Sequence, residues 1–166
     1  RSLVQAMGSR AAADRVGEVV NRLSVEAEAA LVREGVILEH NDQLLRVAQR
    51  MRDLLADTSW QDAEWRELLR REPAVAAAAR RYLDEALAGR VPLVTFSTLL
   101  PTWRTVIERL GVTVDAQAFG ELVNRLNERA EKVLVQEGTI RGHNERIKLI
   151  AQRMREPGVR SDLAQI

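Results

Sequence analysis

An internal repeat constrains the fold of this chain more than any other feature. Residues 1–52 reappear as residues 104–155 at a fixed offset of 103, with 23 identical residues in 52 aligned positions. Composition alone would give roughly 4 identities, so the similarity indicates a duplicated unit. The best-matched blocks are Val20–Leu23 with Val123–Leu126, His40–Asn41 with His143–Asn144, and Ala48–Arg52 with Ala151–Arg155.

The offset also suggests how the chain is organised. It predicts a first helical unit over residues 1–103 and a partial second unit over residues 104–166. Arg1 aligns with Arg104, which lies inside a helix expected to run to Leu110. We therefore expect the N-terminal helix of the first unit to be truncated and the chain to be a fragment of a longer protein.

Apolar residues recur in both copies at alternating spacings of three and four, which is the pattern of a heptad. We expect an all-α, elongated helical bundle with long heptad-patterned helices over about 10–55 and 114–156, unbroken at Gly35 and Gly138. In the first copy the a-type positions are Val20, Ala27, Glu34, Asn41 and Ala48, and the d-type positions are Leu23, Ala30, Ile37, Leu44 and Met51.

Turn and capping residues divide the rest of the chain into shorter helices. Gly8 and Gly111 are expected to end a helix in each copy, with Ser9 or Asp115 capping the next one. Between the copies we expect a helix over residues 60–71, a second that starts at Pro73 and ends near Gly89, and a third, capped by Ser97 or Thr98, that ends at Leu110. No segment shows the alternation typical of a strand. The aromatic residues are expected to be core anchors: Trp60, Trp65, Tyr82, Phe96, Trp103 and Phe119.

Composition narrows the classes of function. The 25 basic and 24 acidic residues nearly cancel, so the chain lacks the net positive charge typical of proteins that bind nucleic acids or anionic membranes non-specifically. It contains no cysteine, which fits a cytoplasmic protein, and its longest apolar run, residues 74–79, is far shorter than a membrane span. Frequent arginine and alanine suggest a bacterial source. We expect no membrane association.

Four polar residues occupy a-type positions, which the heptad directs into a helix interface. They are Glu34 and Asn41 in the first copy and Glu137 and Asn144 in the second. A buried polar group at such a position fixes the register or orientation of paired helices, and this is the role we expect. Two alternatives are a polar cluster that recognises a partner, and simple exposure on a half-covered stripe.

The two histidines, His40 and His143, each precede an asparagine and an acidic residue. This pattern raises the hypothesis of a metal or proton-transfer site. No cysteine, His-x-x-x-His or Glu-x-x-His pattern accompanies them, however, and a metal needs three or four ligands. We expect each histidine to form a hydrogen bond at the edge of the interface, and we expect no metal and no cofactor.

Basic residues gather towards the end of each long predicted helix: Arg46, Arg50, Arg52, Lys148, Arg153 and Arg155. Cations at a C-terminus compensate the helix dipole, which is the interpretation we favour, and phosphate contact is the alternative. The chain shows no Gly-rich phosphate loop and no pairing of nucleophile and base.

These observations favour a non-catalytic helical repeat segment of a larger bacterial protein. It would serve as a scaffold or docking surface for protein partners, or self-associate through the heptad stripe. The alternative is a nucleic-acid-associated helical module of a plasmid, phage or conjugative-transfer or secretion protein, in which the basic residues contact phosphates.

Overall fold

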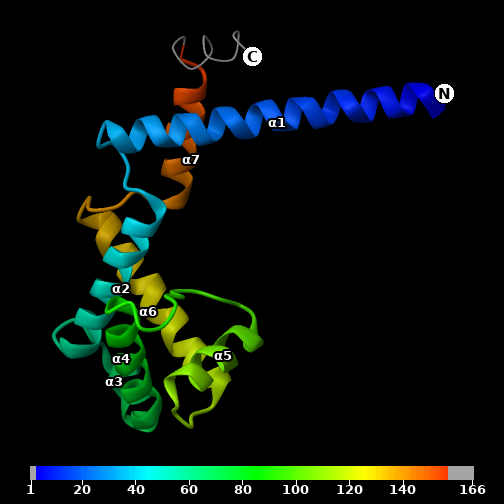
Figure 1. Cartoon of the computed structure of the whole chain (residues 1–166). Coiled ribbons are helices and arrows are strands. Elements are labelled where there is room, and N and C mark those ends of the chain that lie inside the picture. Colours follow the sequence, from blue (N-terminus) through cyan, green and yellow to red (C-terminus); the bar gives the residue numbers. More distant parts are fainter. Residues whose placement is uncertain (1–2, 157–166) are drawn as a thin grey trace. The chain divides into compact units, whose positions relative to one another are not determined.

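A computed structural model describes the backbone of residues 3–156 and the side chains of residues 10–156. The described part is entirely helical, as the sequence predicts, and contains no strand. Figure 1 shows its helices, which are α1 (Leu3–Arg33), α2 (His40–Ala56), α3 (Ala63–Arg71), α4 (Pro73–Leu87), α5 (Leu100–Leu110), α6 (Ala116–Gln136) and α7 (His143–Met154).

The helices form two compact units, and neither coincides with an aligned copy. The central unit is His40–Ile140, and the other, which we call the α1–α7 unit, consists of Arg1–Glu39 and Arg141–Ile166. In the central unit α2 packs against α6, and in the α1–α7 unit α1 packs against α7. Each unit therefore pairs a helix of the first copy with a helix of the second.

The core of the central unit is built around α6, which contacts α2, α4 and α5. Phe119 of α6 lies between two other aromatic residues in edge-to-face contacts, with ring centroids 5.9 Å from Tyr82 and 5.8 Å from Trp103. All three are buried, as expected. The Tyr82 hydroxyl donates to the Pro92 carbonyl at 2.9 Å and accepts from the Val94 amide at 2.5 Å. These bonds attach the connector after α4 to the core.

The other aromatic residues only partly meet the expectation of core anchors. Trp60 and Trp65 are half-buried and pack edge to face with centroids 5.1 Å apart, and the Arg129 guanidinium lies 5.6 Å from the Trp60 ring. Phe96 is exposed, so its assignment to the core is wrong. It lies in a connector without regular structure, where no helix covers it.

Local signals explain the bounds of the short helices. Asp62 caps α3 by accepting from the Trp65 amide, so this helix starts three residues later than predicted. Pro73 opens α4, and Gly89 follows it with a φ of 77°, both as expected. The N-cap of α5 is Leu99, so the cap predicted at Ser97 or Thr98 is wrong.

The prediction of unbroken helices through Gly35 and Gly138 is also wrong. These glycines have φ values of 73° and 75°, in the left-handed region that ends helices. The Val36 amide donates to the Leu31 carbonyl at 3.0 Å, and the Thr139 amide donates to the Leu134 carbonyl at 2.9 Å. Both are bonds of a Schellman motif, so α1 and α6 end in the same way.

The predicted break at Gly8 is absent, because α1 continues through this residue as helix. At the aligned position Gly111 takes a φ of 70° and ends α5, and Asp115 then caps α6 by accepting from the Ala118 amide, as expected. The residues between differ: three β-branched residues, 112–114, and Asp115 align with Ser9–Ala12. Alanine and arginine favour the helix, and Ala12 cannot cap one.

Candidate interaction surface

Two of the predicted polar residues form reciprocal ion pairs between the aligned copies. In the central unit Arg50 donates to both carboxylate oxygens of Glu137, at 3.1 and 2.7 Å. In the α1–α7 unit Arg153 donates to Glu34 at 2.5 Å. Both glutamates are exposed and sit at the ends of α6 and α1, not inside a helix interface. Glu34 aligns with Glu137 and Arg50 aligns with Arg153, so the two ion pairs join the same aligned positions of the two copies.

A more buried arginine anchors the turn after α1 to α7. The Arg146 side chain, 11% exposed, donates to the Glu28 carboxylate at 2.5 Å. Its second terminal nitrogen donates to the Leu38 carbonyl at 2.7 Å. Arg146 was not among the residues selected from the sequence. Because its position differs between the copies, where it aligns with Gln43, the repeat gave no signal for it.

The interior position expected for Asn41 and Asn144 is wrong. Both are exposed in the first turn of α2 and α7, because the chain turns after Gly35 and Gly138 and the heptad does not continue as one helix. His40 and His143 are exposed beside them. Within residues 10–156, no group of His, Asp and Glu side chains has the arrangement of a metal site.

The predicted basic residues are divided equally between the central unit and the α1–α7 unit. Three of them are engaged with carboxylates: Arg50 with Glu137, Arg153 with Glu34 and Glu156, and Arg52 with Asp84 at 3.7 Å. The last turn of α2 contains no basic residue, so the expected compensation of the helix dipole does not apply there. Arg46, Lys148 and Arg155 are exposed.

A cluster of exposed apolar residues lies on the part of α1 that precedes its crossing with α7 (Figure 1). Val16 is 63% exposed, Val19 41% and Val20 46%. The aligned residues of α6 are Phe119, Leu122 and Val123, and they are 0%, 4% and 0% exposed. A stripe that α6 buries against α2, α4 and α5 is therefore open on α1.

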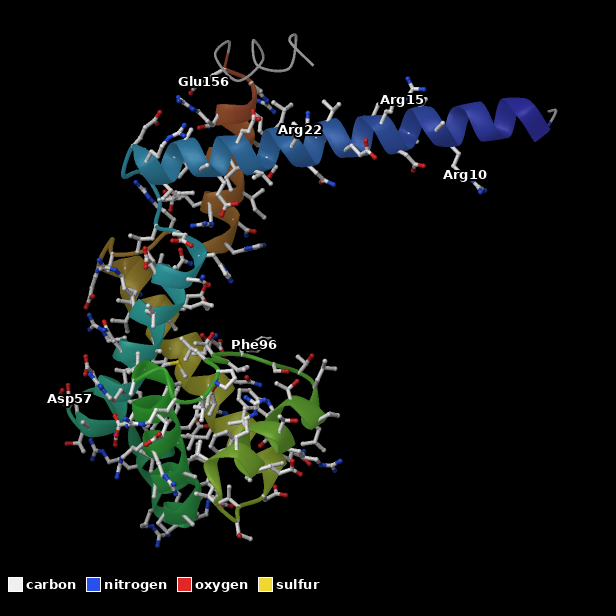
Figure 2. The ribbon with its side chains drawn as sticks, in the orientation of Figure 1. Arg10, Arg15, Arg22, Asp57, Phe96 and Glu156 are labelled. Carbon is white, nitrogen blue, oxygen red and sulfur yellow. The ribbon has the colours of Figure 1, made fainter. Side chains whose placement is uncertain are left out.

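We call Val16, Gly17, Val19, Val20 and Asn21 the docking face of α1. In Figure 2 the labelled side chains of Arg10, Arg15 and Arg22 mark the part of α1 on which it lies. Gly17 and Asn21 are exposed, and no atom lies within 4 Å of where a Cβ on Gly17 would be.

The corresponding residues of α6 make specific contacts with the start of α5. A Cβ on Gly120 would lie 2.6 Å from Nε1 and 2.9 Å from Cγ of Trp103, so only glycine leaves room for the indole. Asn124 accepts from the Ser97 amide at 3.1 Å and donates to the Ser97 carbonyl at 2.8 Å. The indole nitrogen of Trp103 donates to that same carbonyl at 3.1 Å.

The docking face was missed in the selection of site residues from the sequence. A signal was present, since Gly17, Val20 and Asn21 are identical to Gly120, Val123 and Asn124. Identity alone does not say which side of a helix is covered. The exposure of α1 and the contacts of α6 are tertiary properties, so only the structure reveals them.

Comparison with known proteins gives no match, whether to a protein-family model, a curated protein or a solved structure. A search of the helices in the described residues finds none with the length and apolar character needed to cross a membrane.

Proposed function

We propose that this chain is a non-catalytic docking segment of a larger protein, and that it binds a protein partner through the docking face of α1. One observation carries the proposal: Val16, Val19 and Val20 are open to solvent, whereas the residues aligned with them on α6 are buried. Exposed apolar residues gathered on one helix face are typical of interaction surfaces.

The repeat belongs to the same proposal. Three features support units of one kind: α1 and α6 end at aligned residues, the turns after them have matching hydrogen bonds, and the ion pairs at Glu34 and Glu137 are reciprocal. Repeated helical units bury their faces against neighbouring units of the same kind. A helix that resembles α6 but is exposed over residues 10–22 is therefore a natural binding surface.

The apolar contribution of this surface is modest. Full burial of a valine contributes about 1.5 kcal/mol, and the three valines are roughly half-exposed, so covering them contributes about 2 kcal/mol. That is worth between one and two orders of magnitude in affinity. The partner must therefore also make polar contacts, and Asn21 is a polar group available on this face.

The nucleic-acid alternative receives less support. Arg50, Arg52 and Arg153, half of the basic residues proposed to contact phosphate, are paired with carboxylates. Phosphate contact would have to replace these ion pairs. The alternative predicts binding to duplex DNA or RNA that weakens steeply with added salt, and absence of binding at low salt would remove it.

Photo-crosslinking in the native cell tests the proposed function. A photoreactive amino acid is placed at position 16 or 20 of the docking face, or at position 18 or 22 as a control. Glu18 and Arg22 are exposed, and so are Glu121 and Arg125, the residues aligned with them, which makes these positions matched controls.

The expected result is a discrete protein adduct from positions 16 and 20 that is weaker or absent from positions 18 and 22. The adduct should also disappear when Val19→Asp is introduced. Adducts of equal yield from both pairs of positions, or from neither, would contradict docking through this face.

A further inference from the structure

The contacts between α6 and α5 define how a helix docks on this kind of face. The side chain of Asn124 forms hydrogen bonds with the main-chain amide and carbonyl of Ser97. Trp103 on α5 fills the space beside Gly120, where a Cβ would otherwise lie. Trp103 also closes back on Ser97 through its indole nitrogen. Segment 97–103 is thus recognised by its main chain and by one large aromatic side chain.

α1 has the glycine and the asparagine of this arrangement, but within the described residues no segment equivalent to residues 97–103 lies against them. Gly17 and Asn21 occupy the positions of Gly120 and Asn124, and Val20 and Leu23 are identical to Val123 and Leu126. No neighbour within α1 or α7 accounts for Gly17, because the space around it is open. Glycine lowers the stability of a helix interior relative to alanine, so its presence here is unfavourable for α1 alone.

From this correspondence we infer that the docking face of α1 binds a helix from another unit of the same repeat. A tryptophan on that helix packs against Gly17, and the main chain of a residue before the helix forms hydrogen bonds with Asn21. The inference rests on the proposed function and names its partner. The occupant is a segment equivalent to residues 97–110 of this chain, in which an extended residue precedes a short helix that bears the tryptophan.

The docking face of α1 has smaller side chains than the aligned face of α6, and this difference determines which side chains the bound segment needs. Val16 and Val19 of α1 replace the larger Phe119 and Leu122 of α6. Phe119 fills the space between Tyr82 and Trp103, with ring centroids 5.9 and 5.8 Å away. A unit that fits α1 closely must therefore fill the volume that Phe119 occupies in the central unit, since cores are filled without voids.

The test extends this chain by one unit built from its own residues. A second copy of residues 40–115 is joined to Ala13 in place of residues 1–12, because Ala13 aligns with Ala116. The added segment then supplies the turn at Gly111 and the Asp115 cap that α1 lacks at Gly8. Two extended chains are made, one unchanged and one with Val16→Phe and Val19→Leu, which restores the residues of α6. A single cysteine is introduced at position 17, 20 or 18, since the chain has none of its own, and its alkylation rate is measured.

Alkylation at position 20 should slow by about tenfold or more in the extended chain with the two restored residues, because the cysteine then reacts only when the unit opens. Alkylation at position 18 should stay unchanged within about twofold, since its aligned residue Glu121 is exposed. A cysteine at position 17 should itself prevent docking, so that it reacts equally fast in the original and extended chains.

Asn21→Asp and replacement of the added tryptophan by alanine provide the specific controls. Each should restore fast alkylation at position 20 in the extended chain. Asn21→Asp should leave the original chain unaffected, because Asn21 is exposed there. Slowing that survives both substitutions would overturn the inference, because it would show non-specific apolar cover.

Equal alkylation at position 20 with and without the extension, in both extended chains, would also overturn the inference. So would concentration-dependent protection of position 20 in the original chain with a doubled mass in sedimentation, since α1 would then be covered by a second α1. In either case a face-specific crosslink to another protein would still support the proposed function, so the two failures are distinguishable.

Discussion

Gly120→Ala changes one hydrogen atom into a methyl group at the tightest contact of the central unit. That methyl would lie 2.6 Å from Nε1 of Trp103, an indole that is 3% exposed and already packed against Phe119. Overpacking of this kind costs about 1–3 kcal/mol. Displacing the ring also weakens its hydrogen bond to the Ser97 carbonyl, which contributes about 0.5–1.5 kcal/mol.

Alanine gains about 0.5–1 kcal/mol over glycine in a helix, so the net loss of unfolding free energy should be about 0.5–4 kcal/mol, centred near 2 kcal/mol. For a unit of about 100 residues the central value lowers Tm by about 8–16 °C. The matched substitution Gly17→Ala has the opposite sign, because a Cβ there meets nothing within 4 Å. It should stabilise α1 by about 0.5–1 kcal/mol.

Two spectroscopic signals separate these effects. All three tryptophans lie in the central unit, so their fluorescence reports its unfolding, whereas far-ultraviolet ellipticity reports both units. Gly120→Ala should shift the fluorescence transition, and Trp103→Phe should reduce that shift in a double-mutant cycle. Gly17→Ala should leave fluorescence unchanged and increase helical ellipticity. Equal effects of the two alanines on the fluorescence transition would refute this reasoning about Gly120.

Three further predictions concern other contacts. Tyr82→Phe should cost about 0.5–1.5 kcal/mol, measured by urea unfolding, because the Pro92 carbonyl and the half-buried Val94 amide lose the hydroxyl as a hydrogen-bond partner. Burial raises the pKa of Tyr82, so above about pH 10 the unfolded chain releases the hydroxyl proton before the folded chain does. The wild-type protein should therefore lose stability as the pH rises above about 10, and Tyr82→Phe should lose less. Equal loss of unfolding free energy with pH in the two proteins would contradict this. Gly138→Ala should cost about 1–2 kcal/mol because its φ of 75° is strained for alanine, and Gly138→Asn should cost less; the reverse order in thermal melts would count against a left-handed cap. A double-mutant cycle of Arg50→Ala and Glu137→Ala should give a coupling of only about 0.2–1 kcal/mol that falls in high salt, since the side chains are 33% and 43% exposed, and a coupling above that range would show a stronger role for the pair.

The short helices could be predicted from the sequence because their signals are local. Pro73 and Gly89 mark the ends of α4, and Gly111 and Asp115 mark the turn before α6, at or near the predicted positions. Each signal depends on the conformation of one or two residues. It therefore does not require knowledge of what packs against the helix.

The long helices were predicted wrongly because two signals conflict at Gly35 and Gly138. The apolar stripe keeps its heptad phase across each turn, which favoured one helix, whereas the left-handed conformation of glycine ends it. At Gly8 the same conflict resolves in the opposite direction, because Ser9–Ala12 favour the helix and Ala12 provides no cap. Glycine alone therefore does not predict a break, and the residues that follow it decide.

Of the candidate site, the sequence identified the polar residues but not their environment. Glu34 and Glu137 each pair with an arginine of the other copy, yet they do so at exposed helix ends. The docking face depends on which part of α1 is covered within the described residues, and this is a property of packing between distant segments. The sequence shows that Gly17, Val20 and Asn21 are identical to the aligned residues of α6, but it does not show that they are exposed.

A cysteine footprint tests docking through α1 most directly. Val16→Cys and Glu18→Cys are compared for their alkylation rates in the purified chain and in the native cell. Both positions are exposed in the structure, so both should react quickly in the purified chain. In the cell, position 16 should be protected by about tenfold or more while position 18 continues to react quickly. Equal reactivity of the two positions in the cell would contradict the proposal that this face of α1 docks a partner.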